Sequence, residues 1–102
     1  MKFGLADTVI KKMESVFETN PRIEKAVLFG SRAKGNFKEG SDIDLAIKGS
    51  DFTFDDLLKL SGKLDDLNLV YKIDLLDYAK ISEPDLKDHI NRVGMEFYKR
   101  KT

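Results

Sequence analysis

The sequence predicts an α+β domain in which helices pack on one small mixed β-sheet. Segments with helical apolar spacing and short apolar runs follow each other in the order α-β-β-α-β-α, and the C-terminal residues are compatible with a closing strand. The length of 102 residues suits one domain with one modest core, so residues 1–102 are expected to form a single unit. No internal repeat or Pro/Gly-rich linker marks a domain boundary.

Charge and composition exclude several classes of function. The 18 Lys and Arg residues balance the 18 Asp and Glu residues, whereas nucleic-acid binders usually carry a basic excess, so no nucleic-acid partner is expected. The absence of cysteine excludes disulfides, thiol catalysis and cysteine-ligated zinc. No apolar run is long enough to span a membrane and the N-terminus lacks the apolar core of a signal peptide, so we expect a cytoplasmic protein.

The first half of the chain predicts one helix and two strands around a loop. Apolar residues from Leu5 to Phe17 recur at three- and four-residue spacings, which is the pattern of an amphipathic helix, and Asn20-Pro21 ends it. The apolar run Ala26–Phe29 then leads directly into a Gly-Ser turn. The expected elements are a helix over about 5–19, a strand over 23–29, a loop over 31–41 that opens with a helical turn, and a strand over 42–47.

The second half predicts two more helices and a third strand. Thr53, followed by Asp56 three residues later, resembles a capping box that starts a helix. Pro84 suits the first turn of the last helix, and Gly94 can end it. The expected elements are a helix from Phe54 to about Leu67, a strand over 70–76, a helix that opens at Ser82 and runs through Val93, and a short final strand over 95–98.

Two aspartates one residue apart are the first sign of a reactive site. Because side chains alternate along a strand, Asp42 and Asp44 are expected to point the same way, while Ile43 and Leu45 face the opposite layer. Two carboxylates held together repel unless a cation lies between them. Oxygen ligands suit Mg²⁺ or Mn²⁺, which also bind the phosphates of a substrate.

A third carboxylate, Asp74, lies in an otherwise apolar strand that is expected beside the first pair. A buried aspartate is costly unless it is paired, hydrogen-bonded or bound to a metal. Three converging carboxylates can hold two metal ions about 4 Å apart, which suits an in-line phosphoryl displacement. In this scheme Asp42 and Asp44 bridge both ions, and Asp74 completes the second ion or accepts the proton of the attacking hydroxyl.

The turn before the aspartate pair is suited to a nucleoside triphosphate. Gly30 and Ser31 can offer backbone N–H groups and a hydroxyl to phosphate, and Arg32 can add a fixed positive charge. Ser41, directly before the pair, completes the expected nucleotide-binding set. The α-phosphorus is then attacked, and pyrophosphate leaves.

Each feature also has a purely structural explanation when it is taken alone. Gly30-Ser31 could be only a tight turn, and Asp42 could cap a turn with Asp44 facing solvent. Asp74 could pair with Lys72 across a sheet edge. The joint occurrence of these features, in this order and on these elements, favours a nucleotidyl-transfer site. The roles of Lys34, Asp77 and the basic C-terminus are left open.

The chain resembles the DNA polymerase β-like nucleotidyltransferase superfamily in three segments, Gly30-Ser31-Arg32-Ala33-Lys34-Gly35, Ser41-Asp42-Ile43-Asp44-Leu45 and Ile73-Asp74-Leu75. Its short length is similar to that of the minimal nucleotidyltransferases (MNT), the antitoxin partners of HEPN ribonuclease toxins. The family usually has arginine where this chain has Lys34, which keeps the charge but loses the planar fork.

The resemblance implies a nucleotidyltransferase fold, Mg²⁺ as the metal and ATP as the nucleotide. It further implies transfer of AMP to a hydroxyl, such as a tyrosine of a helical HEPN partner, and exposed apolar side chains on a terminal helix as the sign of that interface. Two alternatives stay open. One is an antitoxin that neutralises its partner by binding alone, and the other is nucleotidyl transfer to a small molecule or an RNA end.

Overall fold

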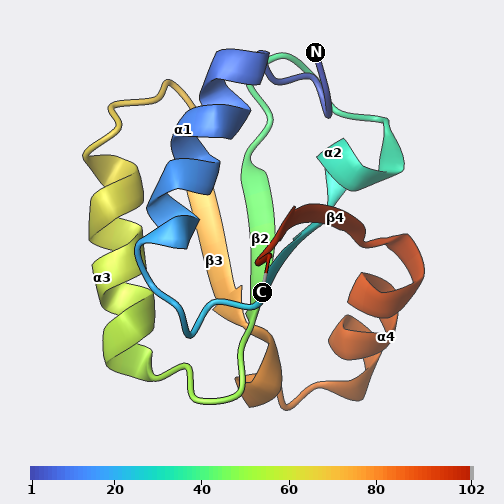
Figure 1. Cartoon of the computed structure of the whole chain (residues 1–102). Helices are drawn as coiled ribbons and strands as arrows, with labels where there is room; N and C mark the ends of the chain where they lie inside the picture. The colour runs from blue at the N-terminus through green and yellow to red at the C-terminus, as the bar shows by residue number, and fades with distance from the viewer. Residues whose placement is uncertain (102) are drawn as a thin grey trace.

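The fold is built on one four-stranded mixed sheet, which a computed structural model describes over residues 1–101 (Figure 1). Helices pack on this sheet, so the predicted α+β class is confirmed. Most of the predicted elements are present within a few residues of their expected bounds. The elements are α1 (Asp7–Glu18), β1 (Lys25–Phe29), α2 (Ser31–Lys34), β2 (Ile43–Lys48), α3 (Phe54–Asp65), β3 (Ile73–Asp77), the 3-10 helix η1 (Tyr78–Lys80), α4 (Pro84–Val93) and β4 (Met95–Lys99).

The strands lie in the order β3-β2-β1-β4, so the two strands joined by the Gly-rich loop are central. β1 pairs antiparallel with β2 and with β4, whereas β2 and β3 are parallel. Parallel neighbours need a crossover connection, and α3 provides it between β2 and β3. The short final strand expected at the C-terminus is confirmed as β4.

Apolar side chains from α1, α3 and one face of the sheet form the core. α1 and α3 pack on each other on one side of the sheet, at the left of Figure 1, while α4 lies at the right and contacts β1. Alternation along β2 directs Ile43, Leu45 and Ile47 into this core, where all three are fully buried. Asp44 therefore projects from the opposite face of the sheet, away from α1 and α3.

Several predicted boundaries differ from the structure: among others, the first helix begins at Asp7 and the first strand at Lys25, and α3 ends at Asp65. β2 begins at Ile43, so Asp42 lies just before the strand rather than in it. The third strand begins at Ile73 instead of Val70, whose side chain is 92% exposed. The last helix begins at Pro84, because this residue fits the first turn of a helix and Glu83 occupies the N-cap.

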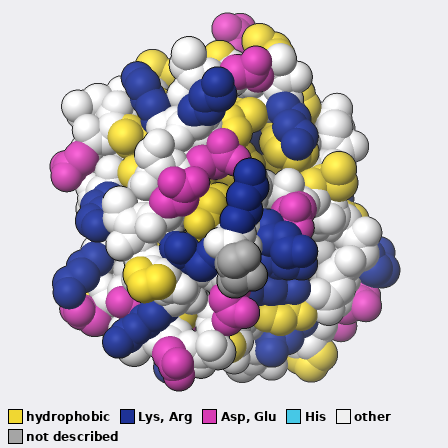
Figure 2. Space-filling model, in the orientation of Figure 1, with side chains coloured by type: hydrophobic (Ala, Val, Ile, Leu, Met, Phe, Trp, Pro, Cys, Tyr) yellow, Lys and Arg dark blue, Asp and Glu magenta, His cyan; other side chains and the backbone are white. Residues whose placement is uncertain are grey.

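The surface mixes both signs of charge. Figure 2 shows Lys and Arg side chains interspersed with Asp and Glu over the viewed face, as the balanced composition requires. Large exposed apolar side chains occur on α3, at Phe54 and Leu58, which are 65% and 55% exposed, and none of comparable exposure is found on α4. None of the helices described over residues 1–101 is long and apolar enough to cross a membrane.

Candidate active site

Asp44 and Asp74 lie side by side on neighbouring strands. The parallel register of β2 and β3 places Asp44 opposite Asp74, as it places Ile43 opposite Ile73. Residues in register on adjacent strands share a face, so both carboxyls project from the sheet face that α1 and α3 leave free. The expected position of Asp74, beside the strand that carries Asp44, is therefore found in the structure.

This arrangement changes the acid–base behaviour of Asp44. Its partial burial is the largest cause that raises the pKa of its carboxyl above the ordinary value. Asp74 raises the pKa further, by charge repulsion and by a side-chain hydrogen bond, and Asp42 adds repulsion. Lys72 has a smaller opposite effect. The site thus concentrates negative charge, which a cation would relieve.

Gly30 follows β1 directly and packs against the carboxylate of Asp44. Its φ of +76° is a conformation that residues with a side chain rarely adopt. A Cβ atom at this position would collide with Oδ2 of Asp44. The turn after β1 and the carboxylate on β2 are therefore in direct contact, and only glycine leaves room for both.

Ser31 begins α2, which has only four residues. The first N–H groups of a helix have no partner within the helix, so those of Ser31 and Arg32 remain available at the turn. Gly35 ends α2 in the left-handed conformation and donates its N–H to the carbonyl of Ser31. The helical turn expected at the start of the loop is thus present, and it holds Ser31 next to Gly30.

The structure places Arg32 differently from the prediction of a direct phosphate contact. Its side chain is 2% exposed. Its guanidinium donates hydrogen bonds to the backbone carbonyls of Phe3, Glu39 and Ser41, at distances from 2.8 to 3.2 Å. These bonds occupy most of its five N–H donors, so Arg32 serves the loop rather than a phosphate.

Ser41 likewise serves the loop. Its hydroxyl accepts a hydrogen bond of 2.8 Å from the backbone N–H of Lys38, and its carbonyl accepts two from Arg32. Ser41 was expected to bind nucleotide, but its side chain and its carbonyl are both engaged within the protein. Its position directly before Asp42 makes it a link between the loop and the carboxylates.

The three aspartates do not converge as closely as the sequence suggested. Asp42 precedes β2 and is exposed, although it is close enough to Asp44 to repel its charge. Within residues 1–101, no three His, Cys, Asp or Glu side chains come together as a preformed metal site. The closest acidic pair at this point of the fold is Asp44 with Asp74.

Asp74 also forms the ion pair that was its alternative explanation. Nζ of Lys72 lies 3.7 Å from Oδ1 of Asp74, and the two side chains are 72% and 44% exposed. Ion pairs at this exposure are screened by water and contribute little to stability. Lys72 therefore leaves Asp74 accessible beside Asp44.

The donor set fits a hard divalent cation that arrives with a phosphate ligand. Mg²⁺ is usually bound through one or two carboxylates together with substrate phosphates, rather than by a complete protein cage. Asp44 and Asp74 would supply the carboxylates for such an ion, and Asp42 lies near Asp44. Gly30, which packs against Asp44, directly precedes Ser31 at the start of α2, so the carboxylates lie next to this turn.

Sequence reasoning missed the aromatic residues that enclose Arg32. The guanidinium carbon lies 5.1 Å from the ring centre of Phe37 and 4.9 Å from that of Tyr71. Tyr71 precedes β3 and Phe37 belongs to the loop, so no local pattern links them.

Asp77, whose role the sequence left open, is nearly buried. Its carboxylate accepts a hydrogen bond from the N–H of Ala79 and thereby caps η1.

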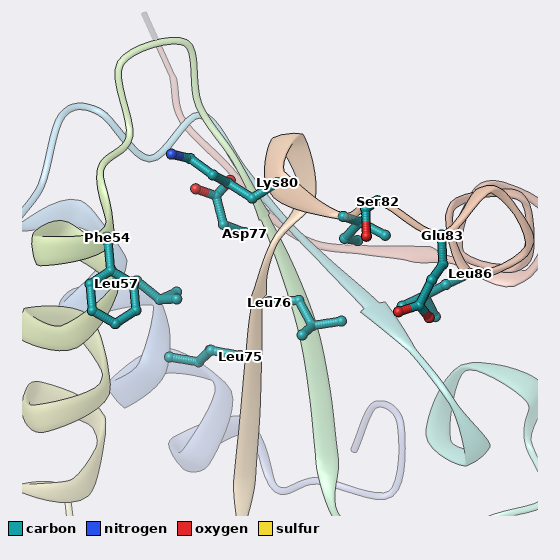
Figure 3. A pocket seen from close by; sticks show the side chains of 10 residues that line it. Phe54, Leu57, Leu75, Leu76, Asp77, Lys80, Ser82, Glu83 and Leu86 are labelled. Atoms are coloured by element: carbon teal, nitrogen blue, oxygen red, sulfur yellow. The ribbon is translucent and has the colours of Figure 1, made fainter.

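A hollow of about 300 Å³ lies at the β3 edge of the sheet, beside the carboxylates rather than at them. Figure 3 shows Leu75 directed toward Phe54 and Leu57 of α3, with the polar side chains of Asp77 and Lys80 above. Neither Asp44 nor Asp74 lines this hollow, so we do not assign the nucleotide to it.

Comparison with known proteins identifies the family of the chain. The family model described as "Polymerase beta, Nucleotidyltransferase" matches residues 11–102. A Haemophilus influenzae protein named "Probable protein adenylyltransferase MntA" is 44% identical over 68 residues, which cover 64% of this chain and 57% of that protein. The chain spans about half the length of the curated relatives that it matches.

Solved structures share the fold. A toxin–antitoxin crystal structure with AMP-PNP has a TM-score of 0.71 and 24% identity, and the match covers 90% of this chain and 74% of that chain. A structure of a tri-AMPylated Shewanella oneidensis HEPN toxin in complex with an MNT antitoxin has a TM-score of 0.66 and 21% identity, covering 91% and 71%. Because the family model covers most of the sequence, the chain belongs to the polymerase beta nucleotidyltransferase family.

Proposed function

We propose that this protein is a Mg²⁺-dependent nucleotidyltransferase that transfers AMP from ATP to a hydroxyl of a partner protein. The observation that carries the proposal is the pair of carboxyls of Asp44 and Asp74, which lie side by side, with Asp44 in contact with the Gly30 turn. The family to which the chain belongs supports the class of reaction.

Each residue of the site has a role in this proposal. The backbone at Gly30 and Ser31 holds the triphosphate, and the carboxylates of Asp42, Asp44 and Asp74 hold the metal. Bound Mg²⁺ would neutralise phosphate charge and lower the pKa of the attacking hydroxyl. The hydroxyl oxygen forms a bond to the α-phosphorus, the bond to the bridging oxygen breaks, and pyrophosphate leaves. The hydroxyl proton passes to the carboxylate of Asp74.

We propose a HEPN-type toxin as the partner and a tyrosine of that partner as the acceptor. The support is the names of the relatives, which describe a protein adenylyltransferase and an AMPylated HEPN toxin bound to an MNT antitoxin. The reaction consumes ATP, so we propose the cytoplasm as its compartment. The interface was expected on a terminal helix, but among the helices the large exposed apolar side chains, Phe54 and Leu58, lie on α3.

A second candidate is an antitoxin that acts by binding alone. The observation that favours it is that residues 1–101 contain no preformed site of three metal ligands. Under this hypothesis the carboxylates have no catalytic use. Both candidates predict a stable complex with a partner, so complex formation does not separate them, whereas an assay of nucleotidyl transfer does.

The test is transfer of label from ATP labelled at the α-phosphate, with Mg²⁺, in a lysate of the source organism. The wild type is compared with the double variant Asp42→Asn, Asp44→Asn, which keeps the shape of both side chains and removes their charge. We expect a labelled protein band with the wild type only, and the mass of that band identifies the acceptor.

Other outcomes contradict the proposal in different ways. Label in RNA or in a small molecule would identify another acceptor for the same chemistry. No label, with the double variant still purifying together with the same partner, would support the binding-only antitoxin.

A further inference from the structure

The side chain of Arg32 connects three separate segments of the chain. Its Nη1 donates to the carbonyl of Phe3 at 2.9 Å, and its Nη2 donates to the carbonyls of Glu39 and Ser41 at 3.2 and 2.8 Å. Its Nε donates to the same Ser41 carbonyl at 3.1 Å. One guanidinium thus ties the N-terminal segment and the end of the loop to α2.

Two aromatic rings lie close to this guanidinium. Phe37 and Tyr71 lie within cation–π distance of it, at 5.1 and 4.9 Å. Burial of a charge is costly unless its hydrogen-bonding groups are satisfied, and here backbone carbonyls satisfy them. A lysine at this position could not reproduce the planar fork that gives two bonds to one carbonyl. The surroundings of residue 32 therefore favour arginine over lysine.

The position of Ser41 gives this cluster a functional consequence. Its carbonyl, which receives two bonds from Arg32, directly precedes Asp42, and β2 begins one residue later. At its other end Arg32 is part of α2, one residue after Ser31. The guanidinium therefore spans the loop between the Gly30–Ser31 turn and Asp42.

We propose that Arg32 is a positioning residue, which sets Asp42 relative to the Gly30–Ser31 turn and to Asp44. The inference rests on the proposed function, because it assigns Asp42 to the metal–nucleotide. Without the fork, the loop over residues 35–41 loses its anchor and Asp42, which is exposed and outside the strand, loses its fixed place. Arg32 acts through Asp42 and does not touch the substrate.

Arg100 provides a matched control within the same chain. Its guanidinium also donates to several backbone carbonyls, at distances from 2.7 to 3.4 Å. Those carbonyls lie at the end of α1 and just before β1, and the carbonyl of Glu24 also accepts from the backbone N–H of Arg100. The Arg100 cluster is therefore at the N-terminal end of β1, whereas Gly30 follows its C-terminal end. Arg100→Lys therefore removes a comparable structural clamp without touching the site.

The experiment measures the affinity of Arg32→Lys and Arg100→Lys for Mn²⁺–AMP-PNP by isothermal titration calorimetry, together with their midpoints of thermal unfolding. Substitution of a residue that orients a metal ligand typically weakens metal binding by about 10- to 100-fold. We therefore expect Arg32→Lys to bind Mn²⁺–AMP-PNP at least about tenfold more weakly than the wild type does. We expect Arg100→Lys to bind within about twofold of the wild type, although both variants lose stability.

A double-mutant cycle tests whether Arg32 acts through Asp42. In a chain that already carries Asp42→Asn, Arg32→Lys should weaken binding much less than in the wild type, by about twofold or less. If the loss is the same with and without Asp42→Asn, the inference is wrong.

A second variant, Phe37→Leu, tests the inference in case Arg32→Lys does not fold. It keeps the guanidinium of Arg32 and removes one of the two rings beside it. We expect Phe37→Leu to bind Mn²⁺–AMP-PNP about threefold more weakly than the wild type does.

The outcomes separate this inference from the proposed function. If the wild type binds Mn²⁺–AMP-PNP and the two arginine variants lose the same affinity, or neither loses any, the positioning role is refuted and the proposed function stands. Unchanged binding by Phe37→Leu would also count against the positioning role. If the wild type does not bind Mn²⁺–AMP-PNP, the proposed function fails and this inference fails with it.

Discussion

At the scale of single residues, the backbone of Gly30 and the carboxylate of Asp44 restrict each other. Gly30→Ala would force a side chain into a positive-φ conformation and against Oδ2 of Asp44. We expect it to lower the free energy of unfolding by about 2 kcal/mol, since the left-handed conformation alone costs an L-residue about 1–2 kcal/mol. Urea denaturation measures the change.

Gly62 is the matched control for this substitution. It lies inside α3, where an added Cβ would meet no atom within 4 Å apart from its chain neighbours and the backbone of its own helix. Gly62→Ala should raise the free energy of unfolding by about 0.5–1 kcal/mol, because glycine is a poor helix former. Equal effects of the two substitutions would show that the contact between Gly30 and Asp44 is absent in solution.

The carboxyl of Asp44 makes the stability of the fold depend on pH. Folding raises its pKa above the ordinary value of 3.8, through burial and through the charges of Asp74 and Asp42, with Lys72 opposing. The folded chain therefore binds this proton more tightly than the unfolded chain does. The stability that Asp44 contributes is complete below 3.8 and is lost as the pH rises through the folded-state pKa.

Asp44→Asn should consequently stabilise the metal-free protein at neutral pH. Removal of a like charge from neighbouring strands is expected to raise the free energy of unfolding by about 0.5 kcal/mol, and the advantage should shrink as the pH falls toward 3.8. Urea denaturation at several pH values measures it, with Asp51→Asn on an exposed turn as the control. A variant less stable than the wild type at neutral pH would contradict the strained carboxyl pair.

At the scale of elements, the crossover helix α3 holds β3 beside β2 and thereby Asp74 beside Asp44. Its start is fixed by a capping box, in which the Thr53 side chain accepts from the N–H of Asp56 and the Asp56 carboxylate accepts from the N–H of Thr53. These bonds also lower the pKa of Asp56, with the backbone bond from Thr53 as the largest cause. This cap was predicted from the sequence and is confirmed.

Thr53→Ala removes the side-chain half of the cap. We expect it to reduce the free energy of unfolding by about 1 kcal/mol, the usual effect of losing an N-cap. Chemical denaturation measures the loss, and Thr8→Ala, on the exposed face of α1, should stay within about 0.5 kcal/mol of the wild type. If Thr53→Ala is no less stable than Thr8→Ala, the cap does not help to fix α3.

At the scale of the whole molecule, apolar spacing was sufficient to predict the order of elements and the α+β class. The period-2 pattern also placed Asp44 on the face away from Leu45, and the adjacent strands brought Asp74 to it. Strand ends were harder to predict, because pairing decides them. Val70 is apolar but exposed, since the ladder with β2 begins only at Ile73.

The role of Arg32 could not be predicted from the sequence for a related reason. A positive charge beside a Gly-Ser turn suggests a phosphate ligand when it is read locally. Its burial depends on Phe3 and Tyr71, which are far from it in the sequence and meet it only after the sheet forms. Local patterns thus predicted the carboxylates, whereas the contacts that hold the loop between them depend on the folded chain.

The central claim is that the carboxylate site breaks ATP between the α- and β-phosphates and transfers AMP. The most direct measurement compares α-labelled with γ-labelled ATP in parallel reactions of the purified protein and its partner, with pyrophosphate release measured alongside. We predict label on the partner from α-labelled ATP only, with one pyrophosphate released for each AMP transferred. Transfer of the γ-label, or no transfer in a complex that forms normally, would contradict the claim.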